Sequence, residues 1–222
     1  WSSDSKVVDQ PLSIRGSGGK PWRPKNFSGV FHGTTTVGRA LIHSYNIPAV
    51  KVLGKVGLAP VHRLAEQAGI SSDMPPDLSL ALGAVDVSLL EMSGAYQPFV
   101  CSGTYRQPTL IRRIENGDGK EIYRDGGTAR QVLSPAAAVE IKGLLVRVIS
   151  EGTGKKARGI PGISGGKTGT SDENRDAWFI GFNKAQISGV WIGHDRNQSL
   201  GDNENGGTTA APVWLDFMKN RK

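Results

Sequence analysis

The most regular pattern in the chain is an apolar stripe at helical spacing over residues 136–149. Ser134 and Pro135 precede this stripe as a capping residue and a first-turn proline, and Gly152 follows it as a stop. The same spacing predicts shorter helices, several with a capping residue at the start, and we expect their apolar stripes to face the core. These helices cover residues 37–42, 50–56, 61–68, 88–99 and 212–218. The hydroxyls of the three threonines at 34–36 are available to cap the first of them.

Strand patterns follow in the last third of the chain. Residues 177–182 and 187–193 are apolar, aromatic runs joined by a four-residue connection, which predicts antiparallel pairing. A second hairpin, on the surface, is predicted where residues 108–114 and 121–123 flank an Asn-Gly-Asp-Gly turn. Residues 1–33 are rich in glycine, serine and proline and indicate irregular or hairpin-like structure. Helices clustered before an antiparallel sheet predict the α+β fold class.

Composition narrows the partners but does not identify the function. The chain has 222 residues, 37% hydrophobic and 21% charged, which is ordinary for one large globular domain. Its formal net charge of +7 is scattered, without the basic run and interleaved aromatics of a nucleic-acid groove, so we expect no nucleic-acid partner. Cys101 is the only cysteine and the four histidines lack paired spacing, so we expect no metal. Cys101 itself is predicted to be a buried small hydrophobe.

The segment around Lys167 can be interpreted in two ways. Its residues Gly166-Lys167-Thr168 match the end of the phosphate-loop pattern G-x-x-x-x-G-K-[ST]. The first glycine of that pattern would fall on Pro161, which lacks the N–H that a phosphate would need. A phosphate loop should also lead into a helix, whereas this segment leads into a predicted strand. We therefore favour an edge strand.

On an edge strand, the residues Lys167-Thr168-Gly169-Thr170 suit recognition of an extended peptide. The lysine would project an ammonium into a cleft, and the two threonine hydroxyls could bind a carboxylate. Gly169 has no Cβ, so another backbone can approach closely and add to the sheet as a strand.

A second short motif, Ser44-Tyr45-Asn46, lies between two predicted helices. Ser-x-Asn and Lys-Thr-Gly, together with Ser-x-x-Lys, are the motif set of serine β-lactamases and penicillin-binding proteins. Over almost its whole length the sequence resembles the transpeptidase domain of a bifunctional, class A penicillin-binding protein. The stretches that carry the resemblance are residues 9–14, 22–26, 43–50, 80–83, 152–154, 166–171 and 176–181.

The resemblance implies an antiparallel sheet flanked by helices, as in penicillin-binding proteins and serine β-lactamases. It implies a serine DD-transpeptidase of cell-wall synthesis and cell shape that cross-links peptidoglycan stem peptides, is a target of β-lactam antibiotics and needs no cofactor. His43 would be structural, because lysines act as the bases of this family. The implied catalytic residues are Ser44, Asn46, Lys167 and Thr170. The implied substrate-binding residues are Tyr45, Thr168, Gly169 and Ser171.

The family's nucleophile, the serine of Ser-x-x-Lys, has no convincing match. The three formal matches begin at Ser3, Ser17 and Ser164, and none of them opens an amphipathic helix. We therefore expect the serine upstream of Trp1, with residues 1–222 as the C-terminal portion of one domain, inactive without the upstream portion. A sheet that draws strands from upstream should also leave one edge unpaired here.

Two other functions remain open. A degenerate, non-catalytic penicillin-binding module would bind or sense peptidoglycan without the serine. A β-lactamase would need a Glu-x-x-x-Asn element to position water, and we find none. The resemblance also implies a preceding glycosyltransferase domain and an N-terminal membrane anchor outside this chain, which would place the domain at the outer face of the cytoplasmic membrane, in the periplasm.

Overall fold

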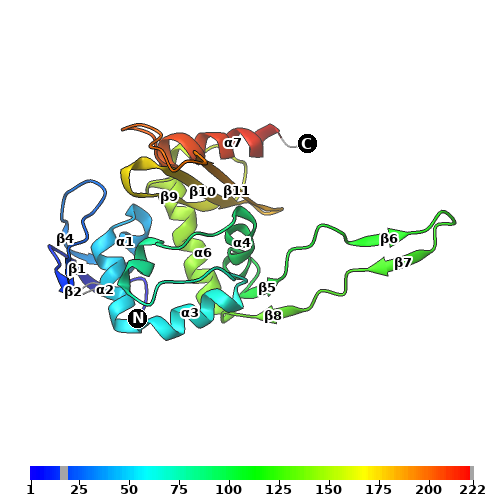
Figure 1. The fold of residues 1–222 in the computed structure, drawn as a ribbon, viewed down its shortest axis with the longest axis horizontal. Coiled ribbons are helices and arrows are strands. Elements are labelled where there is room, and N and C mark those ends of the chain that lie inside the picture. The colour runs from blue at the N-terminus through cyan, green and yellow to red at the C-terminus, as the bar shows by residue number, and fades with distance from the viewer. Residues whose placement is uncertain (16–19, 221–222) are drawn as a thin grey trace.

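The structure is a computed structural model that describes residues 1–15 and 20–220 (Figure 1). Residues 16–19 of the predicted irregular stretch, Ser17 among them, lie outside the described residues. Among the described residues, no helix is both long enough and apolar enough to cross a membrane.

A three-stranded antiparallel sheet forms the upper layer of the molecule in Figure 1. Its strands are β9 (Gly165–Thr170), β10 (Asp176–Phe182) and β11 (Ile187–Gly193), in the order β11-β10-β9. Helix α7 (Ala211–Asn220) covers one face, and α6 (Pro135–Ser150) supports β9 from the other. Within the described part of the chain, the outer edges of β9 and β11 pair with no further strand. The predicted strands, their antiparallel pairing and the unpaired edge are confirmed.

Aromatic packing holds the sheet to α7. Phe179 of β10 and Trp214 of α7 are both fully buried, with ring centroids 5.1 Å apart. Gly181 makes room for the indole, because a Cβ there would lie 2.6 Å from the Trp214 ring. Burying a side chain such as Phe179 contributes about 1.5–3 kcal/mol, so this contact holds α7 against the sheet.

A helical layer lies below the sheet and contains α1 (Val37–His43), α2 (Asn46–Val56) and α3 (Leu58–Gln67). Ile42, Ile47 and Val148 are fully buried where α1, α2 and α6 meet. Helix α6 begins at the predicted serine cap, since the Ser134 hydroxyl accepts a hydrogen bond from Ala137 N. Because α6 contacts both α1 and β9, it connects the helical layer to the sheet.

The N-terminal segment folds against this layer as short strands. Strand β1 (Lys6–Asp9) pairs antiparallel with β4 (Gly33–Thr36), and β2 (Ile14–Arg15) pairs with β3 (Pro21–Trp22). The predicted hairpin-like structure is confirmed. Of the three threonines expected to cap α1, only Thr36, the last residue of β4, does so; Thr34 and Thr35 lie further inside the strand.

The prediction of one helix over residues 88–99 is wrong. The expected capping box of Ser88 and Glu91 is present, but α4 (Leu89–Ala95) ends before α5 (Gln97–Val100). Pro98 lacks an N–H and so cannot continue the hydrogen-bond ladder of α4. Cys101, predicted to be buried, is exposed, because it caps the short α5 at a surface turn. The stripes of α3 and α4 are also only half-buried, although Ala68 beyond α3 is buried.

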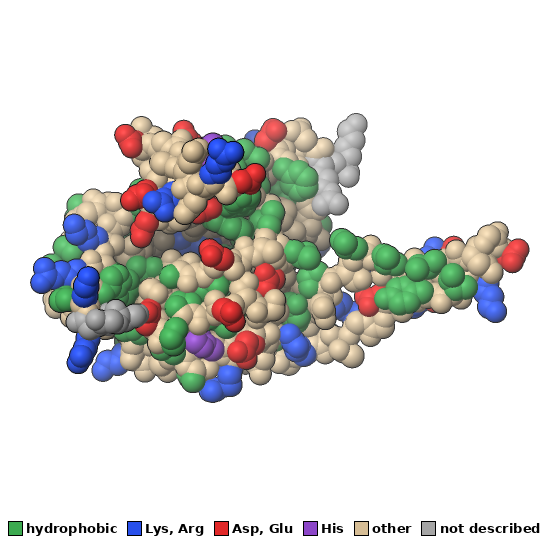
Figure 2. Space-filling model, in the orientation of Figure 1, with side chains coloured by type: hydrophobic (Ala, Val, Ile, Leu, Met, Phe, Trp, Pro, Cys, Tyr) green, Lys and Arg blue, Asp and Glu red, His purple; other side chains and the backbone are tan. Residues whose placement is uncertain are grey.

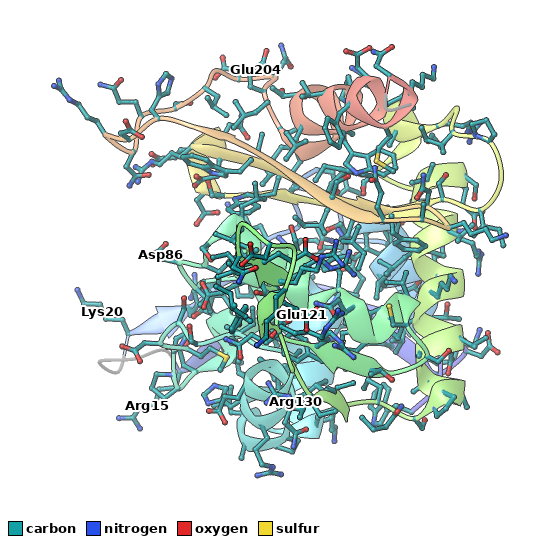
Figure 3. All side chains as sticks on the ribbon, turned by 90° about the vertical axis from the view of Figure 1, so that its right-hand side faces the viewer. Arg15, Lys20, Asp86, Glu121, Arg130 and Glu204 are labelled. Carbon is teal, nitrogen blue, oxygen red and sulfur yellow. The ribbon has the colours of Figure 1, made fainter. Side chains whose placement is uncertain are left out.

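The predicted surface hairpin is the tip of a long arm, which projects to the right in Figure 1. Strands β5 (Thr104–Arg106) and β8 (Ala129–Gln131) form its base, and β6 (Arg113–Glu115) and β7 (Glu121–Arg124) form its tip. Arg130 anchors the base to α3, donating from Nε to Gln67 O over 2.8 Å (Figure 3). Apolar side chains line much of the visible side of the arm (Figure 2).

Short helical turns complete the fold. They are η2 (Leu78–Leu82), η3 (Lys155–Ala157), η4 (Asp172–Asn174) and η5 (Gly206–Ala210). Turn η5 lies against both β9 and β10 and leads directly into α7.

Candidate active site

Ser44 occupies the junction between α1 and α2 in a left-handed backbone conformation. Its φ of 58° and ψ of 46° are rare for a residue other than glycine and cost about 1–2 kcal/mol. This conformation ends α1, and the N–H of the next residue, Tyr45, turns back to Ala40 O over 2.8 Å. Strained backbone that is held by its surroundings is a common property of functional sites.

The Ser44 hydroxyl faces Lys167 on the edge strand β9. Lys167 Nζ donates to Ser44 Oγ over 2.8 Å and to Thr168 O over 3.0 Å. Burial lowers the pKa of Lys167 to about 8, because taking the ammonium out of water disfavours its charged form. A proton donor that titrates near neutral pH therefore lies in direct contact with a hydroxyl.

Thr153 joins this site and was not predicted to do so. Its hydroxyl lies 2.7 Å from the hydroxyl of Thr168, and its N–H donates to Ile42 O of α1 over 3.4 Å. Gly152 allows this approach, because a Cβ there would lie 2.2 Å from Ile42 O. The Gly-Thr-Gly motif was visible in the sequence, but only the fold shows that it connects α1 to β9.

The end of β9 is held by η5. Thr170 Oγ1 accepts a hydrogen bond from Gly206 N over 3.1 Å. A Cβ on Gly206 would lie 2.4 Å from both Gly169 O and Trp178 O, so only glycine fits against the strand. In Figure 3, Glu204 marks the segment that leads into η5 above the sheet.

The remaining predicted site residues lie beside this contact. Tyr45 stacks on His32, with ring centroids 3.9 Å apart and planes at 11°. Asn46 Nδ2 donates to Lys25 O over 2.8 Å. Ser171 turns its hydroxyl away toward β10, where it accepts from Asp176 N over 2.8 Å. The structure therefore brings the Ser-x-Asn junction to the Lys-Thr-Gly strand and commits the Ser171 hydroxyl to the sheet.

Charges of both signs act on the junction, since Arg39, Lys155 and Glu151 all influence His43. Burial, reinforced by the charge of Arg39, lowers the pKa of His43, which favours a neutral imidazole there. Ser44 and Lys167 are themselves half-buried, and Figure 2 shows the surface hollowed between the sheet layer and the helical layer. In its charged form, the Lys167 ammonium would attract an anionic ligand to this site.

Residues 166–170 form part of a strand and not a loop before a helix, so the phosphate-loop interpretation is excluded. A Lys-Thr-Gly edge strand facing a Ser-x-Asn helix junction instead defines the class of serine acyl-transfer proteins that includes β-lactamases and penicillin-binding proteins.

Comparison with known proteins identifies the family within this class. The family model for the penicillin binding protein transpeptidase domain matches residues 1–219. Among curated relatives, penicillin-binding protein 1A of Aquifex aeolicus is 38% identical over 91% of this chain, and that of Neisseria cinerea is 34% identical over 98%. The chain belongs to the penicillin-binding protein transpeptidase family, which confirms the resemblance. It spans 28% of the length of these relatives.

A solved structure agrees with this assignment. Penicillin-binding protein 1A of Haemophilus influenzae superposes with a TM-score of 0.90 at 27% identity, over 98% of this chain and 39% of that one. PonA1 of Mycobacterium tuberculosis, at 23% identity, shares the fold with a TM-score of 0.83 over 98% of this chain and 63% of that one. The predicted α+β transpeptidase fold is confirmed.

Proposed function

We propose that this chain forms the Ser-x-Asn and Lys-Thr-Gly walls of a peptidoglycan DD-transpeptidase. The observation that carries the proposal is the 2.8 Å hydrogen bond from Lys167 Nζ to Ser44 Oγ, which joins motifs 123 residues apart in sequence. Membership of the transpeptidase family supports the same reaction.

The proposed reaction is acyl transfer in two steps. A serine hydroxyl attacks the carbonyl between the two D-alanines of a stem peptide, the C–N bond breaks, and D-alanine leaves with a proton on its amine. The amine of a neighbouring stem peptide then attacks the resulting ester, forms the cross-link and returns the serine. A β-lactam would acylate the same serine and stop at the first step.

In this scheme, Ser44 relays a proton toward the leaving amine. Its hydroxyl can accept from Lys167 and donate onward, because a hydroxyl carries one donor and two acceptor positions. Lys167 keeps the cleft electropositive and supports this proton transfer, for which a pKa of about 8 is well matched. The amide of Asn46 orients the lysine of the Ser-x-x-Lys motif and the substrate backbone.

The rest of β9 recognises the substrate. The hydroxyls of Thr168 and Thr170 bind its terminal carboxylate; Thr170 retains its O–H for this purpose while accepting from Gly206 N. The backbone N–H of Thr170 supplies half of an oxyanion hole, and loss of one such donor typically costs about 10²–10³ in rate. Gly169 admits the peptide backbone. Tyr45 and Ser171 border the substrate.

The nucleophilic serine, in this proposal, lies upstream of Trp1, and residues 1–222 are the C-terminal portion of one transpeptidase domain. Neither Ser3, which precedes β1, nor Ser164, which precedes β9, opens a helix. The upstream portion would supply the serine, the anchor and the location at the outer face of the cytoplasmic membrane.

Labelling with a fluorescent penicillin tests this proposal. We expect no covalent labelling of the isolated chain, labelling of the complete protein, and strong loss of labelling in the complete protein carrying Lys167→Ala. Stoichiometric labelling of the isolated chain would contradict the upstream serine. Undiminished labelling of the Lys167→Ala protein would remove Lys167 from the mechanism.

The second candidate is a non-catalytic module that binds or senses peptidoglycan. It is favoured by the absence of a helix-opening Ser-x-x-Lys among the described residues. If it is correct, the complete protein binds stem peptides, for example in calorimetry, but forms no covalent adduct with penicillin.

A further inference from the structure

Two buried polar residues lie beneath the Ser44-Tyr45-Asn46 junction, on segments to which the proposed function gives no role. Asp9, on β1, is 0% exposed, and Asn26, after β3, is 5% exposed. Asn26 Nδ2 donates to Asp9 Oδ2 over 2.7 Å and lies 3.0 Å from Oδ1. Charged and polar groups are buried in this way only when they are fully partnered.

The amide of Asn26 is fixed in one orientation. Its Nδ2 also donates to Val30 O over 2.8 Å, so both amide hydrogens are used. Its Oδ1 accepts from Asn46 N over 2.8 Å and, more weakly, from Ile47 N over 3.4 Å. A flipped amide would direct N–H groups at N–H groups, so Asp9 determines that an acceptor faces Asn46.

These contacts make Asn26 the N-terminal cap of α2. Tyr45, at the N-cap position of that helix, makes no side-chain cap hydrogen bond. The first N–H groups of a helix need an acceptor, and here a side chain from 20 residues upstream provides it. The start of α2, and with it Asn46, is located by a different segment of the chain.

The same aspartate also reaches the middle residue of the junction. Asp9 Oδ2 accepts from His32 N over 2.9 Å and lies 2.8 Å from His32 Nδ1. The His32 ring in turn stacks on Tyr45. Asp9 is therefore linked to Asn46 through Asn26 and to Tyr45 through His32.

We propose that Asp9 and Asn26 are positioning residues for acyl transfer, and that they hold Asn46 and the neighbouring Ser44 at the distance that Lys167 requires. This inference rests on the proposed transpeptidase function. Neither residue contacts the substrate: Asn26 acts through the backbone of Asn46, and Asp9 acts through Asn26. A displacement of about 1 Å at such a site can slow the reaction about 10²-fold.

The variants separate positioning from folding. Asn26→Ala removes the cap of α2, and Asn26→Ser keeps a hydroxyl acceptor in a smaller side chain. Asn26→Asp replaces the amide that donates to Asp9 with a carboxylate, so two carboxylates face each other. Adding Asp9→Asn restores a hydrogen-bond donor between the two side chains, now on residue 9. Gln131→Ala is the matched control, because Gln131 Nε2 likewise joins two segments, at the base of the arm, by donating to Ser102 O over 2.9 Å.

The assay is the time course of fluorescent-penicillin labelling of the complete protein. The final stoichiometry counts folded molecules, whereas the rate constant reports the geometry of the site. We expect Asn26→Ala to reach the wild-type stoichiometry about 10- to 100-fold more slowly. Asn26→Ser should be intermediate, and Gln131→Ala should label at the wild-type rate. The double variant should label faster than Asn26→Asp alone.

The inference is overturned if Asn26→Ala and Asn26→Ser both label at the wild-type rate. It is also overturned if Asn26→Ala or Asn26→Ser lowers the final stoichiometry of labelling but leaves the rate constant at the wild-type value. That result would indicate a purely structural role. A double variant no faster than Asn26→Asp would overturn the link to Asp9. If the wild-type complete protein is not labelled at all, the proposed function fails and the inference fails with it.

Discussion

Replacing Ser44 separates the two properties that the structure assigns to this residue, its strained backbone and its hydroxyl. Ser44→Gly and Ser44→Ala both remove the acceptor of the Lys167 hydrogen bond, so this loss cancels in their comparison. They differ in backbone, because alanine keeps the left-handed strain at φ 58° and glycine relieves it.

The expected difference in stability follows from two opposing terms. The left-handed conformation costs alanine about 1–2 kcal/mol. Glycine avoids this cost, but the greater conformational freedom of its unfolded chain lowers its stability relative to alanine by about 0.4–1 kcal/mol. Ser44→Gly should therefore be more stable than Ser44→Ala by about 0.5–1 kcal/mol, or roughly 1–4 °C in a domain of about 150–250 residues.

Calorimetry of the complete protein measures this difference, and penicillin acylation of the same samples measures function. Both variants should acylate about 10²–10⁴-fold more slowly, since positioned proton transfer typically contributes that much. If the alanine variant were as stable as the glycine variant, the backbone argument would be refuted. If either variant acylated at the wild-type rate, Ser44 would have no part in proton transfer.

Four further predictions concern Lys167, η5 and the arm. The rate of acylation should decline above a pH of about 8 as Lys167 loses its charge. In a pH–rate profile, Lys167→Arg should move this decline to higher pH. If the Lys167→Arg profile is identical to the wild-type profile, Lys167 is not the group that titrates. The pKa of Lys167 is about 8 in the folded protein and 10.5 in the unfolded chain, so the unfolded chain binds more protons between these values. The free energy of unfolding should therefore rise with pH between about 8 and 10.5. Denaturation at several pH values measures this rise, and Lys167→Met, which cannot titrate, is the control. Gly206→Ala should push η5 away from Gly169, lower the melting temperature and slow acylation; unchanged values in both assays would mean that η5 does not hold β9. Replacing residues 110–125 of the arm by a short Gly-Ser link should change the free energy of unfolding by no more than about 0.5 kcal/mol, because β6 and β7 pair with each other and are exposed. A larger decrease in this free energy, measured by denaturation, would show that the tip of the arm packs on the domain.

Local signals in the sequence were sufficient for most elements of the fold. The serine cap and proline of α6, the apolar runs of β10 and β11 and the turn of the arm are each encoded within a few residues, and each appears in the structure. The errors arose where local signals competed. Pro98 interrupts an otherwise continuous apolar stripe, and the turn after it exposes Cys101.

The site was predictable only as far as its motifs were. Lys167 and Ser44 lie 123 residues apart, and no periodicity places them 2.8 Å from each other; the motif pair did. Thr153 and Asn26 lie in stretches that the resemblance included, but their contacts with Thr168 and Asn46 depend on how distant segments pack. Hydrogen bonds between such segments leave no local pattern, so they became visible only in the structure.

Mapping the residue that penicillin acylates in the complete protein, by proteolysis and mass spectrometry of the adduct, tests the roles of Ser44 and Lys167 most directly. We predict one modified serine, in a Ser-x-x-Lys sequence outside residues 1–222, with much less adduct when Lys167 is replaced by alanine. An adduct on a residue within this chain, Ser44 included, would contradict the assignment of Ser44 and Lys167 as partners of a nucleophile supplied from elsewhere.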